Sequence, residues 1–174
     1  MKKSDINQAP SYFDTYINKV EDIELIEALK QSIAELDNLD MAAFEKLGEQ
    51  VYAEGKWTIK DIFQHLIDTE RVMTYRALSF GRNDVFILPG FDENVYAKNV
   101  NTKKRSLKSL IAELKLVHKS SIALYKSFDK KALKRSGMMF KSDMSVLAVG
   151  FVLAGHQKHH LGIIKERYFP LLNS

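Results

Sequence analysis

Four long stretches of the sequence repeat apolar residues at spacings of three and four. The chain has 174 residues but only three prolines and eight glycines, so few of the residues that end or bend helices interrupt these stretches. Apolar residues at such spacings form one face of a helix, whereas strict alternation would indicate a strand. The sequence therefore predicts an all-α fold in a single domain, residues 1–174, with a core from about 22 to 170.

The spacing places the predicted amphipathic helices at about residues 22–39, 58–80, 106–129 and 142–170. Thr58 and Asp61 match the capping-box pattern at the start of the second helix, and Ser142 is the expected cap of the last one. Residues 82–105 form one long irregular connection between the second and third helices, and such long loops often have a function. Four helices joined in this way predict a four-helix bundle.

Three of the five histidines lie within five residues of one another near the end of the chain. His156 and His160 are four residues apart, so both rings project from the same face of a helix. His65, on the second predicted helix, also borders an apolar face and supplies a third nitrogen. Three histidines that leave a fourth position open are typical of a catalytic metal site, because structural zinc sites have four protein ligands.

Two other histidines need separate interpretations. His159 neighbours His156 on the helical wheel and could replace His160 as a ligand, with a spacing of three instead of four. We favour His160 and expect His159 to lie at the edge of the site. His118 has no evident partner and is interpreted as an ordinary helix residue, while Glu70 is expected to orient the His65 region or to pair with an arginine.

A metallopeptidase of the His-Glu-x-x-His type is excluded by the residue that follows His156. In that motif a glutamate at this position acts as the general base. Here the position is Gln157, and an amide cannot accept the proton of a metal-activated water. The sequence therefore does not predict a peptidase of this class.

Composition limits the compartment and the partners. The chain has no cysteine, which excludes disulfides and thiolate ligands and fits a reducing compartment. It begins without an apolar signal sequence, and no stretch is apolar enough to span a bilayer. We therefore expect a cytoplasmic protein with no membrane partner.

The net charge of +4 conceals a basic segment, residues 98–141, which has thirteen Lys or Arg but only two acids, Glu113 and Asp129. Such a segment could attract nucleic acid. However, it lacks the interleaved aromatic residues of a recognition motif, so we interpret it as a solvated helix face and a lysine-rich loop. Nucleic-acid binding is not expected.

Several motifs, in this order, resemble those of the DinB/YfiT-like superfamily. They are Gly55-Lys56-Trp57-Thr58, His65-Leu66-Ile67-Asp68, Tyr75-Arg76-Ala77, Leu88-Pro89-Gly90-Phe91-Asp92, Gly155-His156-x-x-His159-His160 and Glu166-Arg167-Tyr168. The likeness runs from about residue 23 to 169. It implies an up-down-down-up four-helix bundle with a long loop between its second and third helices. It also implies a divalent metal, held at the matching positions His65, His156 and His160.

The resemblance further implies an enzyme, a metal that is zinc or nickel, and a homodimer. The superfamily includes S-transferases that use bacillithiol, a mycothiol-dependent isomerase and proteins described only as metal-dependent hydrolases. We therefore expect either a thiol S-transferase, with a low-molecular-weight thiol as co-substrate, or a hydrolase of a small molecule. The alternative is a helical bundle of the stress response that binds metal, nucleic acid or protein without turnover.

Five further residues are candidates for the chemistry of this site. Asp92 and Glu93, in the long loop, could orient a water molecule or act as a base, or they could be solvated turn residues. Arg76, Arg82 and Lys104 are candidates for binding negatively charged substrate groups at the mouth of the bundle.

Overall fold

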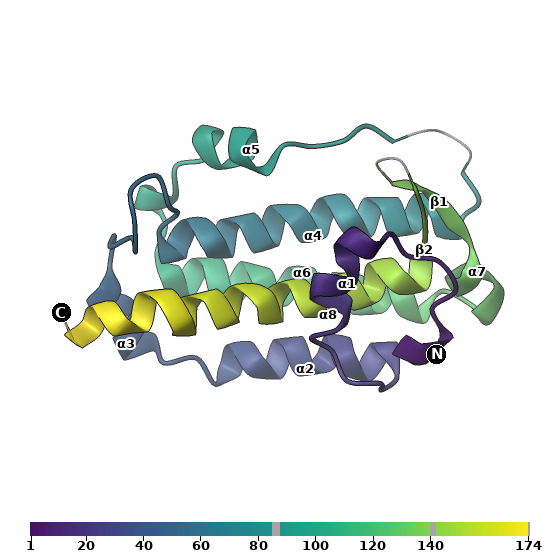
Figure 1. The fold of residues 1–174 in the computed structure, drawn as a ribbon, viewed down its shortest axis with the longest axis horizontal. Helices are drawn as coiled ribbons and strands as arrows, with labels where there is room; N and C mark the ends of the chain where they lie inside the picture. Colours follow the sequence, from purple (N-terminus) through teal and green to yellow (C-terminus); the bar gives the residue numbers. More distant parts are fainter. Residues whose placement is uncertain (85–87, 140–141, 174) are drawn as a thin grey trace.

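The computed structural model describes residues 1–84, 88–139 and 142–173, and helices dominate it (Figure 1). The bundle consists of α2 (Leu25–Asp37), α4 (Ile59–Gly81), α6 (Leu107–Lys126) and α8 (Val146–Ile163). Helices α2 and α8 run in one direction along the bundle, and α4 and α6 run in the other (Figure 1). This arrangement confirms the all-α, up-down-down-up four-helix bundle.

Shorter elements lie before, between and after these helices. They are η1 (Lys3–Asp5), η2 (Ser11–Phe13), α1 (Asp14–Ile17), α3 (Met41–Leu47), α5 (Glu93–Asn99), η3 (Thr102–Lys104), α7 (Lys130–Lys134), β1 (Ser136–Met139), β2 (Ser142–Ser145), the π-helical turn η4 (Ile164–Tyr168) and η5 (Phe169–Asn173). The two strands form an antiparallel hairpin in which Gly137 pairs with Met144. Among the described residues, no helix is long and apolar enough to cross a membrane.

Polar side chains cap the first turns of α4, α6 and α8, where the backbone amides lack partners. Thr58 and Asp61 form the predicted capping box at the start of α4, and Ser106 caps α6. The prediction that Ser142 caps the last helix was wrong. Ser142 pairs within strand β2, so α8 begins only after Ser145, whose hydroxyl accepts a hydrogen bond from the amide of Ala148 at 3.2 Å.

The long connection between α4 and α6 is more ordered than predicted. It contains the short helix α5, which lies along α4 (Figure 1), and the turn η3. Asp92 begins α5 as its N-cap, and Thr102 in η3 donates a hydrogen bond to Asp61 on α4. Residues 85–87 of this connection lie outside the described part of the chain.

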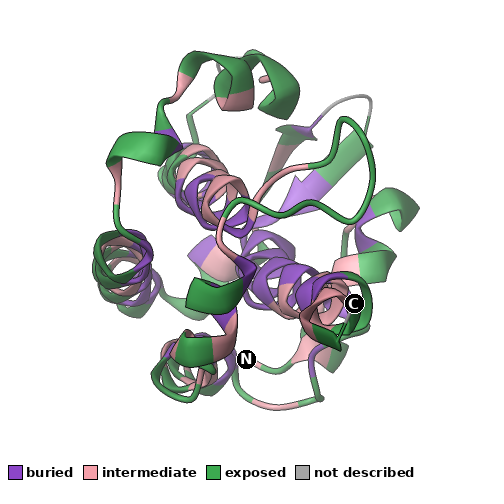
Figure 2. Cartoon of the chain, turned by 90° about the vertical axis from the view of Figure 1, so that its left-hand side faces the viewer, coloured by how far each residue is buried: buried purple, intermediate pink, exposed green. Residues whose placement is uncertain are grey.

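Helix α8 is buried on every side over most of its length, which corrects the amphipathic helix expected there. All residues from Val146 to Gln157 are buried. The bundle covers one side, and α1 packs across the side that would otherwise face solvent. As a result the core also includes Phe13 and Ile17 from the N-terminal segment. Figure 2 shows the buried residues gathered where the helices face one another.

The basic segment at residues 98–141 is distributed over η3, α6, α7 and the hairpin, and Lys141 lies outside the described residues. Most of its lysines are exposed. Its Glu113 accepts hydrogen bonds from both Arg71 and Arg105, and Lys115 forms an ion pair with Asp37 at 2.6 Å. The interpretation of this segment as a solvated face stays a prediction.

Gly155 allows α1 to approach α8 closely. A Cβ atom at this position would lie 2.0 Å from the carbonyl oxygen of Tyr16, far inside van der Waals contact. The backbone of α1 would have to move, because no flexible side chain is available to give way. Gly155 therefore fixes the position of α1, whose Tyr16 ring in turn contacts His156 edge-on at 5.2 Å between ring centroids.

We expect Gly155→Ala to lower the free energy of unfolding by about 1–3 kcal/mol, the usual cost of overpacking, in urea denaturation. Gly162→Ala is the matched control, because a Cβ there meets nothing within 4 Å and alanine favours the helix by about 1 kcal/mol. Equal stability of the two variants would contradict the close approach of α1 and α8.

Candidate metal centre

Helices α4 and α8 bring three histidine rings together inside the bundle. His65 comes from α4, and His156 and His160 come from α8. The Nε2 atom of His156 lies 3.1 Å from Nε2 of His65 and 3.0 Å from Nε2 of His160. One potential ligand atom from each ring lies within 4.8 Å of the other two. The structure thus places side by side the three residues that the sequence pattern singled out.

The donor atoms of this cluster fit a divalent metal. A neutral imidazole nitrogen carries either one proton or one lone pair, so Nε2 of His156 can form a well-directed hydrogen bond with only one of its two neighbours. A cation that accepts all three lone pairs relieves this conflict. Nitrogen ligands about 2.0–2.1 Å from a tetrahedral zinc ion lie roughly 3.3 Å apart, close to the separations found here.

Burial keeps the three rings neutral. It lowers the pKa of His65 to about 4, with a further contribution from the charge of His159. Burial and the neighbouring histidines lower the pKa of His160 to about 3, and they hold the pKa of His156 well below its usual value. All three rings therefore offer lone pairs at neutral pH.

Neighbouring side chains fix the orientation of the rings. The Oγ1 atom of Thr69 lies 3.3 Å from Nδ1 of His65, on the opposite side of the ring from the cluster. A partner at the second nitrogen of a ligating histidine orients the ring and selects the tautomer. The rings of Trp57 and Tyr16 pack against His65 and His156, at centroid distances of 4.7 Å and 5.2 Å.

His159 lies at the edge of the cluster. Its ring is half-buried and packs edge-on against Tyr16 and His160, at centroid distances of 5.3 Å and 5.2 Å. The group of converging ligand atoms found among the described residues leaves it out. This position fits a contact that supports the site better than it fits a ligand.

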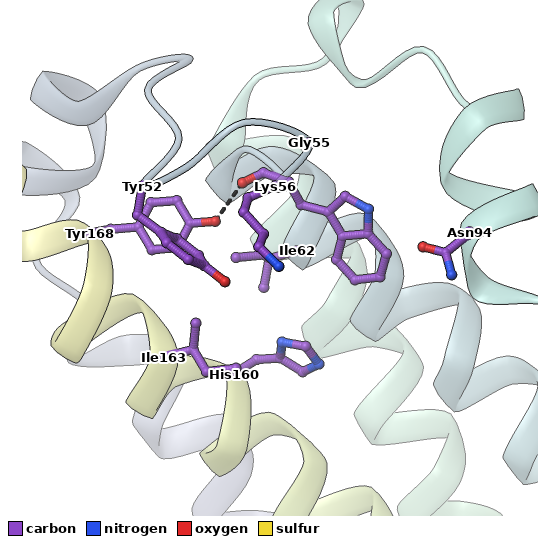
Figure 3. A pocket seen from close by; sticks show the side chains of 9 residues that line it. Tyr52, Gly55, Lys56, Ile62, Asn94, His160, Ile163 and Tyr168 are labelled. Atoms are coloured by element: carbon purple, nitrogen blue, oxygen red, sulfur yellow. Dashed lines mark hydrogen bonds between the residues drawn. The ribbon is translucent and has the colours of Figure 1, made fainter.

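Two cavities reach the histidines. The first, here called the Lys56 cavity, has a volume of about 240 Å³ and is lined by Tyr52, Gly55, Lys56, Trp57, Ile62, Asn94, His160, Ile163 and Tyr168 (Figure 3). The second, the Glu93 cavity, has about 190 Å³ and is lined by Tyr12, Phe13, Tyr16, Trp57, His65, Thr69, Met73, Phe91, Glu93, Val152, His156, His159 and His160. Trp57 and His160 line both, so both cavities adjoin the cluster.

The two acidic candidates have different positions. Glu93 lines the Glu93 cavity together with the three histidines. Asp92 caps α5, where its Oδ1 accepts hydrogen bonds from the amides of Asn94 and Val95 at 2.8 Å and 3.2 Å. The carboxylate of Asp92 is therefore engaged in the local fold, and Glu93 is the one that borders the histidines.

The three basic candidates are not brought to either cavity. Arg76 is buried and donates a hydrogen bond to the carbonyl of Pro89 at 3.1 Å, which ties the long connection to α4. Arg82 follows the last residue of α4, 17 residues and so roughly 25 Å along the helix from His65. Lys104 is exposed at the end of η3.

A buried polar network beside the cluster joins all four bundle helices, and the sequence analysis missed it. Nδ1 of His118 on α6 lies 2.7 Å from Oε2 of Glu70 on α4, an ion-pair contact whose N–H direction is off the line of a hydrogen bond. Nε2 of His118 lies 2.7 Å from the side-chain oxygen of Gln157 on α8. The amide nitrogen of Gln157 donates to the carbonyl of Ser32 and to Glu35 on α2, at 2.8 Å and 3.0 Å.

Charge stabilises this network from within. Burial by itself would lower the pKa of His118, but the contact with the Glu70 carboxylate outweighs it, so the pKa is raised. The other Glu70 oxygen accepts a hydrogen bond from Ser121 at 2.6 Å. Thus the Glu70 carboxylate stabilises the charged form of His118, whereas burial stabilises the neutral form of the histidines in the cluster. The sequence signal for this network was the presence of polar residues at inward positions of three helices.

Comparisons with known proteins agree with the fold described above. A family model described as the DinB superfamily matches residues 24–164. The chain is also similar to a solved structure described as "YfiT from Bacillus subtilis is a probable metal-dependent hydrolase with an unusual four-helix bundle topology". The two share 16% sequence identity with a TM-score of 0.68, over 95% of this chain and 90% of that one. At that identity the likeness concerns the fold. The search of curated proteins finds no match to the chain.

The metal-free protein should lose stability on acidification because of the histidine cluster. A histidine in an unfolded chain has a pKa of about 6.5, whereas His65 has a folded-state pKa of about 4. Between these values the unfolded chain binds more protons, so the free energy of unfolding falls as the pH decreases. We expect His65→Gln to remove about 2 kcal/mol of the fall between pH 7 and pH 4.5, measured by urea denaturation. An unchanged pH dependence would contradict the burial of a neutral His65.

The polar network should contribute strongly to stability. Glu70→Gln leaves a buried imidazolium without its counter-charge, so we expect a loss of about 3 kcal/mol in the free energy of unfolding. The measurement is made at pH 6. Because the pKa of His118 is higher in the folded than in the unfolded state, its charge stabilises the folded protein below the unfolded-state pKa of about 6.5. This contribution is lost as the pH rises through the folded-state pKa.

The matched control for Glu70→Gln is Asp68→Asn, two residues earlier on α4. Asp68 forms a long ion pair with Arg71 at 4.0 Å and accepts a hydrogen bond from Gln64 at 2.9 Å. The side-chain oxygen of an asparagine can still accept that hydrogen bond, so we expect a loss below about 1 kcal/mol. Adding His118→Gln to Glu70→Gln should recover part of the larger loss. Equal losses for Glu70→Gln and Asp68→Asn would show that the buried pair does not stabilise the bundle.

Proposed function

The chain belongs to the DinB superfamily, and from that premise we propose that it is a metal-dependent enzyme in which His65, His156 and His160 hold one divalent ion. The observation that carries this proposal is the convergence of three neutral imidazole nitrogens, with Nε2 of His156 within 3.1 Å of both neighbours. Without a cation, such a group of buried lone pairs has no partner that satisfies all of its members.

Zinc or nickel is the proposed metal. Imidazole ligands suit both ions, and the absence of cysteine from the sequence removes the thiolate ligands that would favour a closed structural site. When bound, an ion of this kind acts as a Lewis acid and makes a water molecule or a thiol nucleophilic near neutral pH. A fourth position, which the three histidines leave free, would be open to such a molecule.

The residues around the cluster support this chemistry by orientation and by exclusion of water. Thr69 holds the second nitrogen of His65, and Trp57 and Tyr16 cover the rings. Of the acidic candidates, Glu93 borders the cavity but is exposed, which suits contact with a substrate better than proton transfer at the ion. Asp92 is assigned to the cap of α5.

We propose hydrolysis of a small molecule as the reaction, and thiol transfer as the second candidate. The similarity in fold to a protein described as a probable metal-dependent hydrolase supports the first. The presence of a second cavity at the same histidines supports the second, because a transferase must bind a co-substrate such as a low-molecular-weight thiol. The homodimer and the cytoplasmic location stay predictions from the sequence.

Metal content tests the proposed centre. We expect protein purified without a histidine tag or added metal to contain about one divalent ion per chain by elemental analysis. His65→Ala and His156→Ala should each lose most of it. His159→Ala, in which a neighbouring ring outside the cluster is removed, should keep it. Wild-type protein with no more metal than the His65 and His156 variants would overturn the proposal.

Assays with and without a thiol distinguish the two reactions. Metal-loaded protein is incubated with ester and amide substrates in the absence of thiol, and separately with bacillithiol and a chloro-arene. Turnover without thiol supports the hydrolase, and turnover that depends on bacillithiol supports the transferase. His65→Ala should abolish either activity, because it removes one of three ligands.

A further inference from the structure

The two cavities that meet at the histidines have opposite charges. The side chain of Lys56 reaches into the Lys56 cavity opposite His160, and Asn94 lies at its far side (Figure 3). No carboxylate is among the described residues that line this cavity. In the Glu93 cavity the relation is reversed, because Glu93 is a lining residue while the part of its wall that the structure describes has no lysine or arginine. Farther out, Lys19 lowers and Glu166 raises the pKa of His159, so charges of both signs lie beyond the wall of this cavity.

The walls of the Glu93 cavity are aromatic. Tyr12, Tyr16, Trp57 and Phe91 all line it. Burial raises the pKa of Tyr16 to about 12, and the charge of Glu93 is among the further contributions, so the carboxylate acts within this group. Aromatic faces together with a carboxylate form the kind of surface that binds organic cations.

The Lys56 cavity suits an anion. An ammonium group is a point charge that binds carboxylates and phosphates, and an amide donates further hydrogen bonds to them. The hydroxyl of Tyr168 donates to the carbonyl of Trp57, which holds the loop between Lys56 and α4 in place over this cavity. The ammonium of Lys56 lies 5.8 Å from the ring of Tyr52, a contact that an anionic ligand can supplement.

The cluster lies where the two cavities adjoin. His160 and Trp57 belong to both linings, so a molecule that extended from one cavity to the other would have its middle part beside His160. Charge and position together therefore select for a molecule with different groups at its two ends.

We propose that this centre takes a small zwitterionic substrate whose ammonium group lies among the aromatic residues beside Glu93. Its anionic group lies near Lys56 and Asn94, and its reacting bond lies between them at the histidines. The inference rests on the proposed function for the reaction of that bond. The recognition of the two charged ends is a property of the cavities, and it can be measured without turnover.

The experiment uses the only tryptophan of the chain as its reporter. Because Trp57 lines both cavities, its fluorescence should respond to a ligand in either. The full-length, metal-free protein is titrated with leucyl-glycine, with N-acetyl-leucyl-glycine, which lacks the ammonium, and with leucyl-glycinamide, which lacks the carboxylate. We expect each blocked peptide to bind about fivefold more weakly than leucyl-glycine, as for the loss of one solvent-exposed charge contact.

Charge-neutral variants assign each end to its cavity. Glu93→Gln should weaken the binding of leucyl-glycine about fivefold but leave the binding of N-acetyl-leucyl-glycine unchanged. Lys56→Gln should weaken the binding of leucyl-glycine by a similar factor but leave the binding of leucyl-glycinamide unchanged. Glu45→Gln on α3 and Lys108→Gln on α6 are matched controls at exposed positions outside both cavities, and they should change nothing. Equal affinity for free and blocked peptides, or equal weakening of all peptides by Glu93→Gln, would overturn the proposal.

The same titrations in zinc-loaded protein separate this inference from the proposed function. Charge selectivity in a protein that retains no zinc would support the zwitterion site and refute the metal centre. Zinc retained by the three histidines without any charge selectivity would support the metal centre and refute the zwitterion site.

Discussion

The buried contact of Gln157 with His118 restricts how α8 is rotated within the bundle, and the candidate centre depends on that rotation. Helix α8 is buried on every side from Val146 to Gln157, so, apart from the close approach of α1 at Gly155, apolar packing would tolerate more than one rotation about its axis. A buried amide that needs partners does not, because an unpaired one would cost about 1–3 kcal/mol. Gln157 finds its partners on α6 and α2. Since each residue turns the helix by about 100°, His156 and His160 then point together to one side of Gln157, where α4 presents His65.

The bundle and the histidine pair could be predicted because both follow from local spacing. Periodic apolar residues indicate helices wherever one face is buried, and a separation of four places two rings on one face whatever the tertiary fold. The environment of α8 could not be predicted in the same way. Its apolar residues lie all round the helix, and the segment that covers its outer side, α1, is too short to show a period. Likewise, Ser142 and Ser145 are equivalent as caps in sequence, and only the pairing of the hairpin distinguishes them.

The partners of His118 could not be predicted from the sequence for a different reason. Glu70 and Gln157 lie on two other helices, the latter 39 residues away, and each residue on its own is an ordinary polar side chain of a helix. Three polar residues at inward positions become informative only when the helices are known to adjoin. The prediction that Arg76 and Arg82 bind substrate was not confirmed for the same reason, since neither residue lines either cavity. Their charge was visible in the sequence, but their depth and position along α4 were not.

The cluster and the network show how one bundle can shift the pKa values of buried histidines in opposite directions. Among the described residues, no carboxylate joins the converging atoms of the cluster. Burial and the neighbouring histidines therefore lower the pKa of His156 and favour the neutral form that a metal requires. His118 has the carboxylate of Glu70, which favours the charged form. Gln157 lies between the polar network and the histidine cluster. Its neutral amide accepts a hydrogen bond from His118 and separates His118 from the neighbouring ligand His156. A glutamate at this position would place a buried carboxylate beside that of the half-buried Glu35, with like charges in contact. Thus Gln157, the residue that excludes the peptidase mechanism, is also the one whose amide joins α8 to α6 and α2.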